Sequence, residues 1–414
     1  MCQGSDKCRF FLIRGPLVGH SLEKSATKRR LLKIALVHKR LDLNGGTERD
    51  LFRTAEGLRD LGHDVHLFCS EYAVAPPKNT IAHRVPVIPF GRTVRLWTFA
   101  WFGHRAVERA QYDVVVGFGR LAHQHVLRVG GGTHRGFLER MGQAEGWPRR
   151  IWQKLSPYHL SLLAIEKRQY ANLNSKKILA VSERAKADIV AHYAVPAEKI
   201  TVLYNGVDLE RFHPRKRGEW RDQIRRRWKI PGASPVVLFV GSGFRRKGLD
   251  RLLSMWNSPS LGQAFLLVVG TDARFDRYQA RAAVIAPERI IFAGRQEAVE
   301  NYYAAADVVV LPSLQEAFGN VVLEALAAGL PVMVSRDVGA AEILRGSLAQ
   351  GIVDLNKGSQ GVETKLLWLL EQSKNLCWMQ QARSLAEEYS WANHFHRLEA
   401  LLLESCQSSV GAHT

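Results

Sequence analysis

The sequence predicts an α/β protein built from two doubly wound, Rossmann-like domains. Short apolar segments alternate with helical segments along the chain, which is typical of parallel βαβ units. This pattern stops at a basic stretch, residues 215–229, and then starts again. A chain of 414 residues is also too long for one compact core. Because ligands of open α/β sheets bind at the carboxyl ends of the strands, we expect the two domains to face each other across a cleft.

The first predicted domain covers residues 32–205 and follows an extension, residues 1–31, that shows no periodic pattern. A helix is expected at residues 50–62, after a Gly-Gly loop. The expected strands are apolar runs bounded by polar residues or glycine, at residues 31–38, 63–69, 113–119, 126–132, 177–182 and 200–206.

The second predicted domain covers residues 206–385. Its expected strands are again short apolar runs, at residues 236–241, 265–270, 289–294, 307–313 and 331–335. The chain then continues with a helical pattern over residues 382–406. We expect a C-terminal helix, residues 386–409, to pack back on the first domain.

Composition favours a globular protein of the cytoplasm. The chain is 46% hydrophobic and 23% charged, and no apolar run approaches the roughly 18 residues that a membrane-spanning helix needs. Its five cysteines are widely spaced and form no C-x-x-C pair, so neither a disulfide framework nor a zinc site is expected. A reducing compartment suits this pattern best.

The net charge of +19 is unevenly distributed. Residues 1–200 contain 33 Lys and Arg against 17 Asp and Glu, whereas the rest of the chain contains 25 against 22. A basic half indicates an acidic partner, which is nucleic acid, anionic lipid or a phosphorylated substrate.

Two acids lie around the start of one apolar helix, in the segment SLQEAFGNVVLEALAAGLPVMVS at residues 313–335. Glu316 follows an expected strand, and Glu324 lies one turn into a helix that should start near Asn320. The free N–H groups from about Phe318 to Val321 favour a phosphate. Two carboxylates beside this turn would repel a phosphate unless each binds another group. Carboxylates accept hydrogen bonds from paired sugar hydroxyls, so the segment predicts a nucleotide-sugar site. The alternative is helix-terminal charge, worth only ~0.3–1 kcal/mol.

This segment resembles the signature E-x-F-G-x-x-x-x-E-A-x-A-x-G-x-P-V of family 4 of the retaining glycosyltransferases, which have the GT-B fold. The matching residues are Glu316, Phe318, Gly319, Glu324, Ala325, Ala327, Gly329, Pro331 and Val332. The resemblance implies that Glu316 lies near the donor sugar and that Glu324 holds the ribose. It also implies that the backbone of Ala317, Phe318, Gly319 and Asn320 binds the diphosphate.

Two more segments resemble phosphate-binding parts of the family. VGSGFRRKGLDRLL, residues 240–253, places Arg246 and Lys247 after a strand and among glycines, where two cations offset the charge of a departing nucleotide. A solvated basic turn is the alternative. In LNGGTERD, residues 43–50, Gly45 and Gly46 let the backbone approach the donor phosphate closely.

The resemblance extends to the base and to a third cation. NGVDLERF, residues 205–212, resembles the entry to the second domain, and its Arg211 either binds phosphate or forms an exposed salt bridge. FAGR, residues 292–295, should lie by the base, with backbone contacts from Gly294 and Arg295.

The expected chemistry needs no metal and no cofactor. Enzymes of the other common glycosyltransferase fold hold a divalent metal with a D-x-D pair, and this chain contains no such pair. No obvious nucleophile is present, so we expect retention by front-face attack assisted by the departing phosphate. His134 follows a glycine run and either faces the acceptor or is a structural histidine.

Residues 135–160 mix cations with amphipathic aromatic side chains, which suits an anionic membrane surface. The aromatic residues are Trp147, Trp152 and Tyr158, and the cations are Arg135, Arg140, Arg149, Arg150 and Lys154. The alternative is a solvated helical hairpin with core tryptophans.

Within the family, GSGFRRKGLDR and the Glu-Ala loop most resemble the glucosyltransferases that add the first glucose to the heptose region of lipopolysaccharide core. The resemblance implies a hexosyltransferase that moves glucose from UDP-glucose to an anionic glycolipid acceptor. It would be cytoplasmic and peripheral on the inner face of the plasma membrane. Alternatives are a mannosyl- or N-acetylhexosaminyltransferase of the same fold, or a basic nucleic-acid-binding protein. The pI of about 9.9 permits the last, but no nucleic-acid-binding motif supports it, so no nucleic-acid partner is expected.

Overall fold

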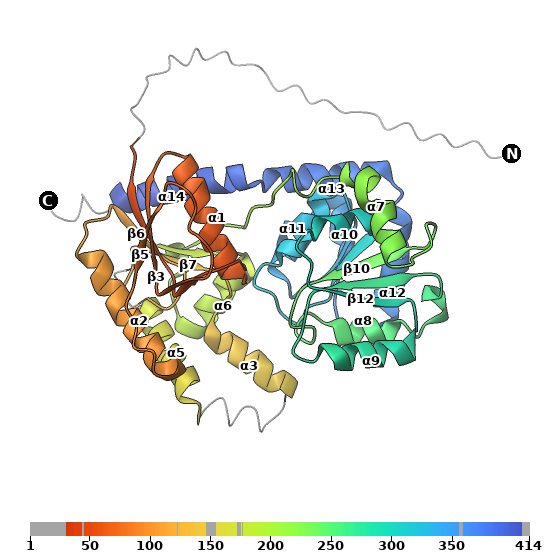
Figure 1. The fold of residues 1–414 in the computed structure, drawn as a ribbon, viewed down its shortest axis with the longest axis horizontal. Helices are drawn as coiled ribbons and strands as arrows, with labels where there is room; N and C mark the ends of the chain where they lie inside the picture. The colour runs from red at the N-terminus through yellow and green to blue at the C-terminus, as the bar shows by residue number, and fades with distance from the viewer. Residues whose placement is uncertain are drawn as a thin grey trace, which may run out of the picture. The chain divides into compact units, whose positions relative to one another are not determined.

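The structure is a computed structural model that describes residues 30–43, 45–121, 123–145, 155–171, 175, 177–355 and 359–407. The part of the chain from Leu32 onward forms one compact unit with two separate parallel sheets (Figure 1). The extension expected at residues 1–31 lies outside the described residues, apart from its last two.

The first sheet has seven parallel strands in the order β5-β3-β1-β6-β7-β8-β9. Its order reverses at β1, so the crevice between the carboxyl ends of β1 and β6 is the expected binding place. The strands are β1 (Lys33–Val37), β3 (Asp64–Cys69), β5 (Ile81–Arg84), β6 (Val114–Gly117), β7 (Val126–Val129), β8 (Lys177–Ala180) and β9 (Ile200–Val202). The helices are α1 (Gly46–Asp60), α2 (Gly91–Glu108), α3 (His134–Glu145), α5 (Pro157–Ala171) and α6 (Glu183–Tyr193). A short pair, β2 (Arg40–Leu41) with β4 (Glu71–Tyr72), lies outside the sheet.

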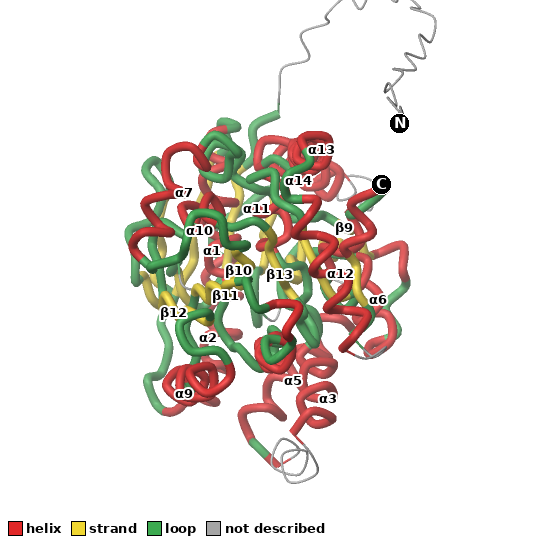
Figure 2. The backbone as a smooth tube through the Cα atoms, turned by 90° about the vertical axis from the view of Figure 1, so that its right-hand side faces the viewer, coloured by secondary structure: helices red, strands yellow, loops and turns green. Residues whose placement is uncertain are grey.

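The second sheet has six parallel strands in the order β12-β11-β10-β13-β14-β15, and its strand order reverses at β10. The strands are β10 (Val236–Val240), β11 (Phe265–Val269), β12 (Ile290–Gly294), β13 (Val308–Leu311), β14 (Val332–Ser335) and β15 (Ile352–Val353). The helices are α7 (Lys216–Arg227), α8 (Leu249–Met255), α9 (Phe275–Ile285), α10 (Glu300–Ala305), α11 (Asn320–Ala327) and α12 (Ser359–Gln372). Helices α7, α10 and α11 lie on one side of the strands and α9 on the other (Figures 1 and 2). Both sheets confirm the doubly wound fold.

The strands that the sequence predicts well are those buried on both faces. β10 and β13, for example, are apolar throughout, and Val237, Leu238, Val308 and Val309 are fully buried. β5 is not among the predicted strands, because three of its four residues are exposed and it carries no apolar run. β15 was not predicted either, because it has only two residues.

The basic stretch that separates the two halves of the pattern is a helix. In α7, Arg217, Arg221 and Arg225 are spaced four residues apart, so they share one face. All three bond to the carboxylate of Asp307, at 2.7, 3.0 and 2.8 Å. Burial raises the pKa of Asp307, but the arginines outweigh it and the net pKa is lowered. Part of the positive charge is therefore neutralised inside the fold.

The helical C-terminal segment forms two helices instead of one. α13 (Leu376–Glu388) and α14 (Trp391–Gln407) are separated at Ser390, which pairs with Val207. α14 lies against α1 (Figure 1), and its Leu398 and Leu402 join the core of the first domain. Gly57 of α1 makes room for this contact, because a Cβ there would come within 2.2 Å of the Phe395 ring. The domain boundaries given above stay a prediction.

Candidate active site

The two loops with the donor-site motifs meet at the edge of the second sheet where the strand order reverses. Residues 241–248 follow β10 and residues 312–319 follow β13, and these two strands are neighbours. The loops are joined by a hydrogen bond of 2.9 Å from the Leu314 N–H to the Arg246 carbonyl. Parallel strands therefore bring together segments about 70 residues apart in the sequence.

Glu316 lies between the two predicted phosphate cations. Arg246 Nη1 is 2.8 Å and Lys247 Nζ is 3.2 Å from the same oxygen, Oε2 of Glu316. Burial raises the pKa of Glu316, but the charges of Lys247 and Arg246 outweigh it and hold the pKa below its ordinary value. Glu316 is therefore ionised at neutral pH. The side chain of Lys247 crosses Gly241, where a Cβ would come within 2.5 Å of it.

The backbone after Glu316 is fixed by bonds to its carbonyl groups. Gly339 N–H donates to the Glu316 carbonyl at 3.0 Å, and Ala340 N–H donates to the Phe318 carbonyl at 2.7 Å. The Ala317 carbonyl accepts from the Ser182 hydroxyl at 2.6 Å. In a trans peptide the N–H points away from the C=O. The N–H groups of residues 317–319 therefore point away from the groups that donate to these carbonyls.

These N–H groups form a ready anion site at the start of α11. In the described part of the chain, the backbone N–H groups of residues 317–321 donate to no protein acceptor. α11 begins at Asn320, as the sequence predicts, and Gly319 before it adopts φ +94°. A side chain at that φ is strained, and its Cβ would meet Val338 at 2.8 Å. Phe318 is buried and anchors the loop.

Glu324 has a hydrogen-bond partner that its sequence motif does not predict. The Tyr303 hydroxyl, at the end of α10, donates to Glu324 Oε2 at 2.5 Å. Burial raises the pKa of Glu324, against the opposing effects of Tyr303, Arg49 and Arg211. Arg49 belongs to α1, so positive charges from both domains lower the pKa of this carboxyl group.

Arg211 forms the salt bridge that was one of its two expected roles. Its Nε donates to Glu300 at 2.8 Å and its Nη2 to the Glu297 carbonyl at 2.9 Å. Gly294 ends β12 with φ +69°, and its carbonyl accepts from the Gly270 N–H at 2.8 Å. Arg295 follows it and is exposed.

Gly45 and Gly46 stand at the start of α1. Gly45 is the residue before the helix, and a Cβ there would come within 1.9 Å of the Glu48 carboxylate. Gly46 has open space around it. Glu48 in turn lies 3.5 Å from His38 Nε2, and this hydrogen bond lowers the Glu48 pKa to about 2, against the effect of burial.

The first domain contains a pocket of about 720 Å³ at the carboxyl edge of its sheet, and His134 lines it. His134 begins α3, its Nε2 is 3.0 Å from His159 Nδ1, and burial lowers its pKa to about 4. Its backbone N–H donates to the buried carboxylate of Glu166 at 2.7 Å. The cations that line the pocket are Lys39, Arg40, Arg92, Arg95, Arg120 and Arg128.

Only part of the expected membrane segment lies in the described residues. Arg135 pairs with Glu139 at 3.3 Å, and Arg140 pairs with Asp188 at 2.9 Å. Tyr158 lies under the Arg92 guanidinium, 4.2 Å from it. Trp147, Trp152, Arg149, Arg150 and Lys154 lie outside the described residues.

Both halves of the chain match known families of glycosyltransferases. Residues 44–211 match the family described as Glycosyltransferase Family 4, and residues 221–384 match Glycosyl transferases group 1. The chain is 27% identical over 351 residues to lipopolysaccharide glucosyltransferase WaaG of Escherichia coli (strain K12). The aligned residues cover 83% of this chain and 91% of that relative. It is also 27% identical over 242 residues to the D-inositol 3-phosphate glycosyltransferase of Corynebacterium jeikeium (strain K411). Here the aligned residues cover 54% of this chain and 57% of that relative.

Solved structures show the same fold. The crystal structure of WaaG, a glycosyltransferase involved in lipopolysaccharide biosynthesis, has a TM-score of 0.74 and 24% sequence identity, over 89% of this chain and 99% of that one. HepE of Anabaena in complex with UDP-glucose has a TM-score of 0.65 and 16% identity, over 90% of this chain and 100% of that one. The protein therefore has the GT-B fold. It is a hexosyltransferase that belongs to the family 4 and group 1 glycosyltransferases.

Proposed function

We propose that the protein transfers glucose from UDP-glucose, with retention, to a glycolipid acceptor such as lipopolysaccharide core. The observation that carries this proposal is the cluster at the edge of the second sheet. There, Glu316, Arg246 and Lys247 lie beside the N–H groups at the start of α11 that donate to no protein acceptor among the described residues. Such a cluster can hold a diphosphate and a sugar at adjacent places. The similarity to WaaG, a lipopolysaccharide glucosyltransferase, supports the choice of sugar and acceptor.

In the proposed mechanism, the donor diphosphate binds the α11 N-terminus together with Arg246 and Lys247. The acceptor hydroxyl attacks the anomeric carbon from the face that the phosphate leaves, and the leaving phosphate oxygen takes the hydroxyl proton. Arg246 and Lys247 then stabilise the charge that develops on the diphosphate, without a metal. Glu316 holds the hydroxyls of the donor sugar, and Glu324 holds those of the ribose.

The acceptor is proposed to enter the pocket of the first domain. Lys39, Arg92 and Arg95 are exposed at this pocket, and an anionic group on a glycolipid offers them a partner. His134 is uncharged at neutral pH, because its pKa is about 4. It can therefore accept a hydrogen bond from a sugar hydroxyl or donate one to it.

We also propose that the protein works in the cytoplasm, as a peripheral protein on the inner face of the plasma membrane. Within the described residues, no helix is both long and apolar enough to cross a membrane. Cations and tryptophans in residues 135–160 support association with an anionic surface.

A thermal-shift screen of UDP-, GDP- and ADP-sugars tests the donor. A ligand at a hundredfold excess over its Kd stabilises by about 2.7 kcal/mol, which is readily detected. We expect UDP and UDP-glucose to raise the Tm, and turnover of UDP-glucose to require a glycolipid acceptor. A shift with GDP-mannose or UDP-N-acetylglucosamine alone would favour the alternative transferases. Retention on heparin at moderate salt without any nucleotide-sugar shift would reject the proposal in favour of nucleic-acid binding.

A further inference from the structure

The loop that is proposed to bind the diphosphate accepts a hydrogen bond from a serine hydroxyl group of the first domain. Ser182 is fully buried and is the residue before α6. Its Oγ accepts from the Ala185 N–H at 3.0 Å and donates to the Ala317 carbonyl at 2.6 Å. Space for this contact is provided by Gly339, because a Cβ there would come within 2.7 Å of Ser182 and 2.1 Å of the Ala317 oxygen. The Ser182 hydroxyl thus caps α6 and also fixes the loop that contains Ala317.

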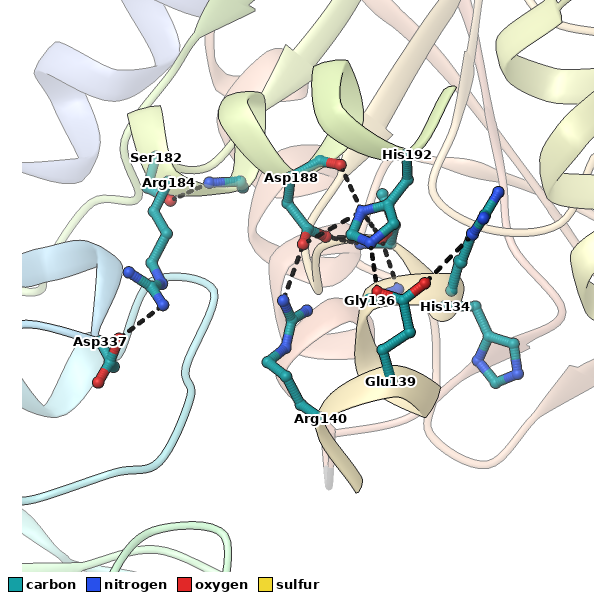
Figure 3. A network of polar contacts seen from close by, with 12 residues as sticks. His134, Gly136, Glu139, Arg140, Ser182, Arg184, Asp188, His192 and Asp337 are labelled. Carbon is teal, nitrogen blue, oxygen red and sulfur yellow. Dashed lines mark hydrogen bonds and ion pairs between the residues drawn. The ribbon is translucent and has the colours of Figure 1, made fainter. Parts of the chain in front are cut away.

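The contact is one of several at the start of α6. Glu342 of the second domain accepts the N–H groups of Glu183 and Arg184, at 2.8 and 2.7 Å. The Arg184 side chain reaches Asp337 at 2.7 Å (Figure 3). The carbonyl of Asp337 accepts the Glu316 N–H at 3.2 Å. The first turn of α6 is therefore fixed against both sides of the Glu316–Ala317 segment.

The remainder of α6 is held within the first domain. Asp188, two turns further on, accepts the N–H and the hydroxyl of Thr133 at 2.9 and 2.6 Å. It also pairs with Arg140, and His192 pairs with Glu139 on the same helix α3 (Figure 3). Ser182 therefore projects from a helix that is fixed at both ends, so its hydroxyl is a well-defined reference point for the loop.

We propose that Ser182 is a positioning residue for the donor diphosphate. Its bond to the Ala317 carbonyl sets the plane of the Ala317–Phe318 peptide, and so directs the Phe318 N–H toward the phosphate. The other carbonyl bonds of the loop come from its own domain, at Gly339 and Ala340. Ser182 thus makes the geometry of the donor loop depend on how the first domain is placed against the second. This inference rests on the proposed function.

The test compares UDP with uridine, because only the diphosphate contacts the loop N–H groups. Calorimetry is run on the wild type, Ser182→Ala and Ser182→Gly. Both variants lose the hydroxyl donor, but glycine is nearly as good as serine at the start of a helix, so Ser182→Gly keeps α6. Loss of one neutral hydrogen bond corresponds to about a five- to tenfold change in affinity. We expect UDP affinity to fall about this much in both variants and uridine affinity to stay within about twofold.

Ser405→Ala is the matched control, because Ser405 is also buried and donates to a carbonyl, that of Leu401 at 2.8 Å. It should leave both affinities unchanged. Unchanged UDP affinity in both Ser182 variants would overturn the inference, as would an equal loss for uridine and UDP, which indicates a general loosening of the structure. If the wild-type protein bound no UDP at all, the proposed function would fail and this inference with it.

Discussion

The hydroxyl of Tyr303 donates a hydrogen bond of 2.5 Å to Glu324 Oε2, from a tyrosine ring that is almost fully buried. The bond orients the Glu324 carboxyl group and opposes the effect of burial, which raises the pKa of Glu324. A paired hydroxyl ligand such as a ribose can then meet a fixed acceptor. The relationship joins the end of α10 to the first turns of α11.

Glu324→Ala should weaken the binding of UDP itself, because the ribose hydroxyls lose their acceptor. Tyr303→Phe should weaken UDP binding less, since the carboxyl group remains but loses its orienting bond.

Glu316→Ala should lower turnover while keeping most of the UDP affinity, because its carboxylate is proposed to hold the donor sugar and not the nucleotide. Calorimetry with UDP, run beside turnover of UDP-glucose, separates these effects. Equal UDP affinity in Glu324→Ala and the wild type would reject the ribose assignment.

Lys247→Ala should lower kcat on the order of 10²-fold or more, as removal of an electrostatic stabiliser at a developing charge often does. The lysine is 3.2 Å from Glu316, and Arg246 remains to pair with this carboxylate, so the loop should keep its structure. Lys365→Ala, on α12, is a suitable control because Lys365 lies over the Trp368 ring and outside this cluster. A kcat for Lys247→Ala within about threefold of the wild type would argue against the assigned role.

Activity should survive EDTA, because Arg246 and Lys247 are proposed to stabilise the leaving diphosphate without a metal. The measurement is the initial rate of UDP-glucose turnover before and after treatment with chelator, with a metal-dependent glycosyltransferase treated in parallel. Loss of activity that Mn²⁺ or Mg²⁺ restores would contradict the metal-free mechanism.

Binding to liposomes tests the role of the basic first half. Residues 1–200 carry 33 Lys and Arg against 17 Asp and Glu, far more cations than one diphosphate needs. Each basic residue near an anionic membrane contributes ~1 kcal/mol. We expect binding to anionic liposomes, little to neutral ones, and release at high salt. Changing Arg149, Arg150 and Lys154 to Ser should weaken binding but leave UDP affinity unchanged. Failure of the wild-type protein to bind anionic liposomes at low salt would refute the membrane assignment.

Most of the fold could be predicted because parallel strands buried on both faces are continuous apolar runs. β1 and β10 are examples, with nearly every residue buried. Edge strands lack this signal: in β5 the exposed residues Ile81 and Ala82 pair with β3 but pack little. The break between α13 and α14 was also missed, because the helical pattern continues through Ser390 and the separation depends on its contact with Val207.

The candidate site could be predicted only where it is local in sequence. Glu316 and Glu324 share one motif, and Arg246 and Lys247 share another. Ser182 and Tyr303 belong to no motif, since each meets its partner only after two elements have packed together. Such long-range contacts have no signature in a single sequence.

Stability should decrease as the pH falls below about 6.5, in part because of His394. This histidine on α14 is buried, and its Nδ1 donates to the Tyr204 carbonyl at 2.7 Å. Burial, helped by the charge of Arg128, lowers its pKa from 6.5 to about 4. The unfolded chain therefore binds a proton that the folded chain does not, over the range from pH 6.5 down to about 4. Within this window the group removes up to about 1.4 kcal/mol of unfolding free energy per pH unit.

The variant His394→Asn isolates this effect, because the Asn amide can still donate to the Tyr204 carbonyl but does not titrate. Urea unfolding at pH 7, 6 and 5 should show a shallower loss of stability in this variant than in the wild type. The same change at His396, which is exposed on the same helix, is the matched control and should keep the wild-type pH dependence. If the three proteins lose stability in parallel between pH 7 and 5, His394 does not cause the acid sensitivity.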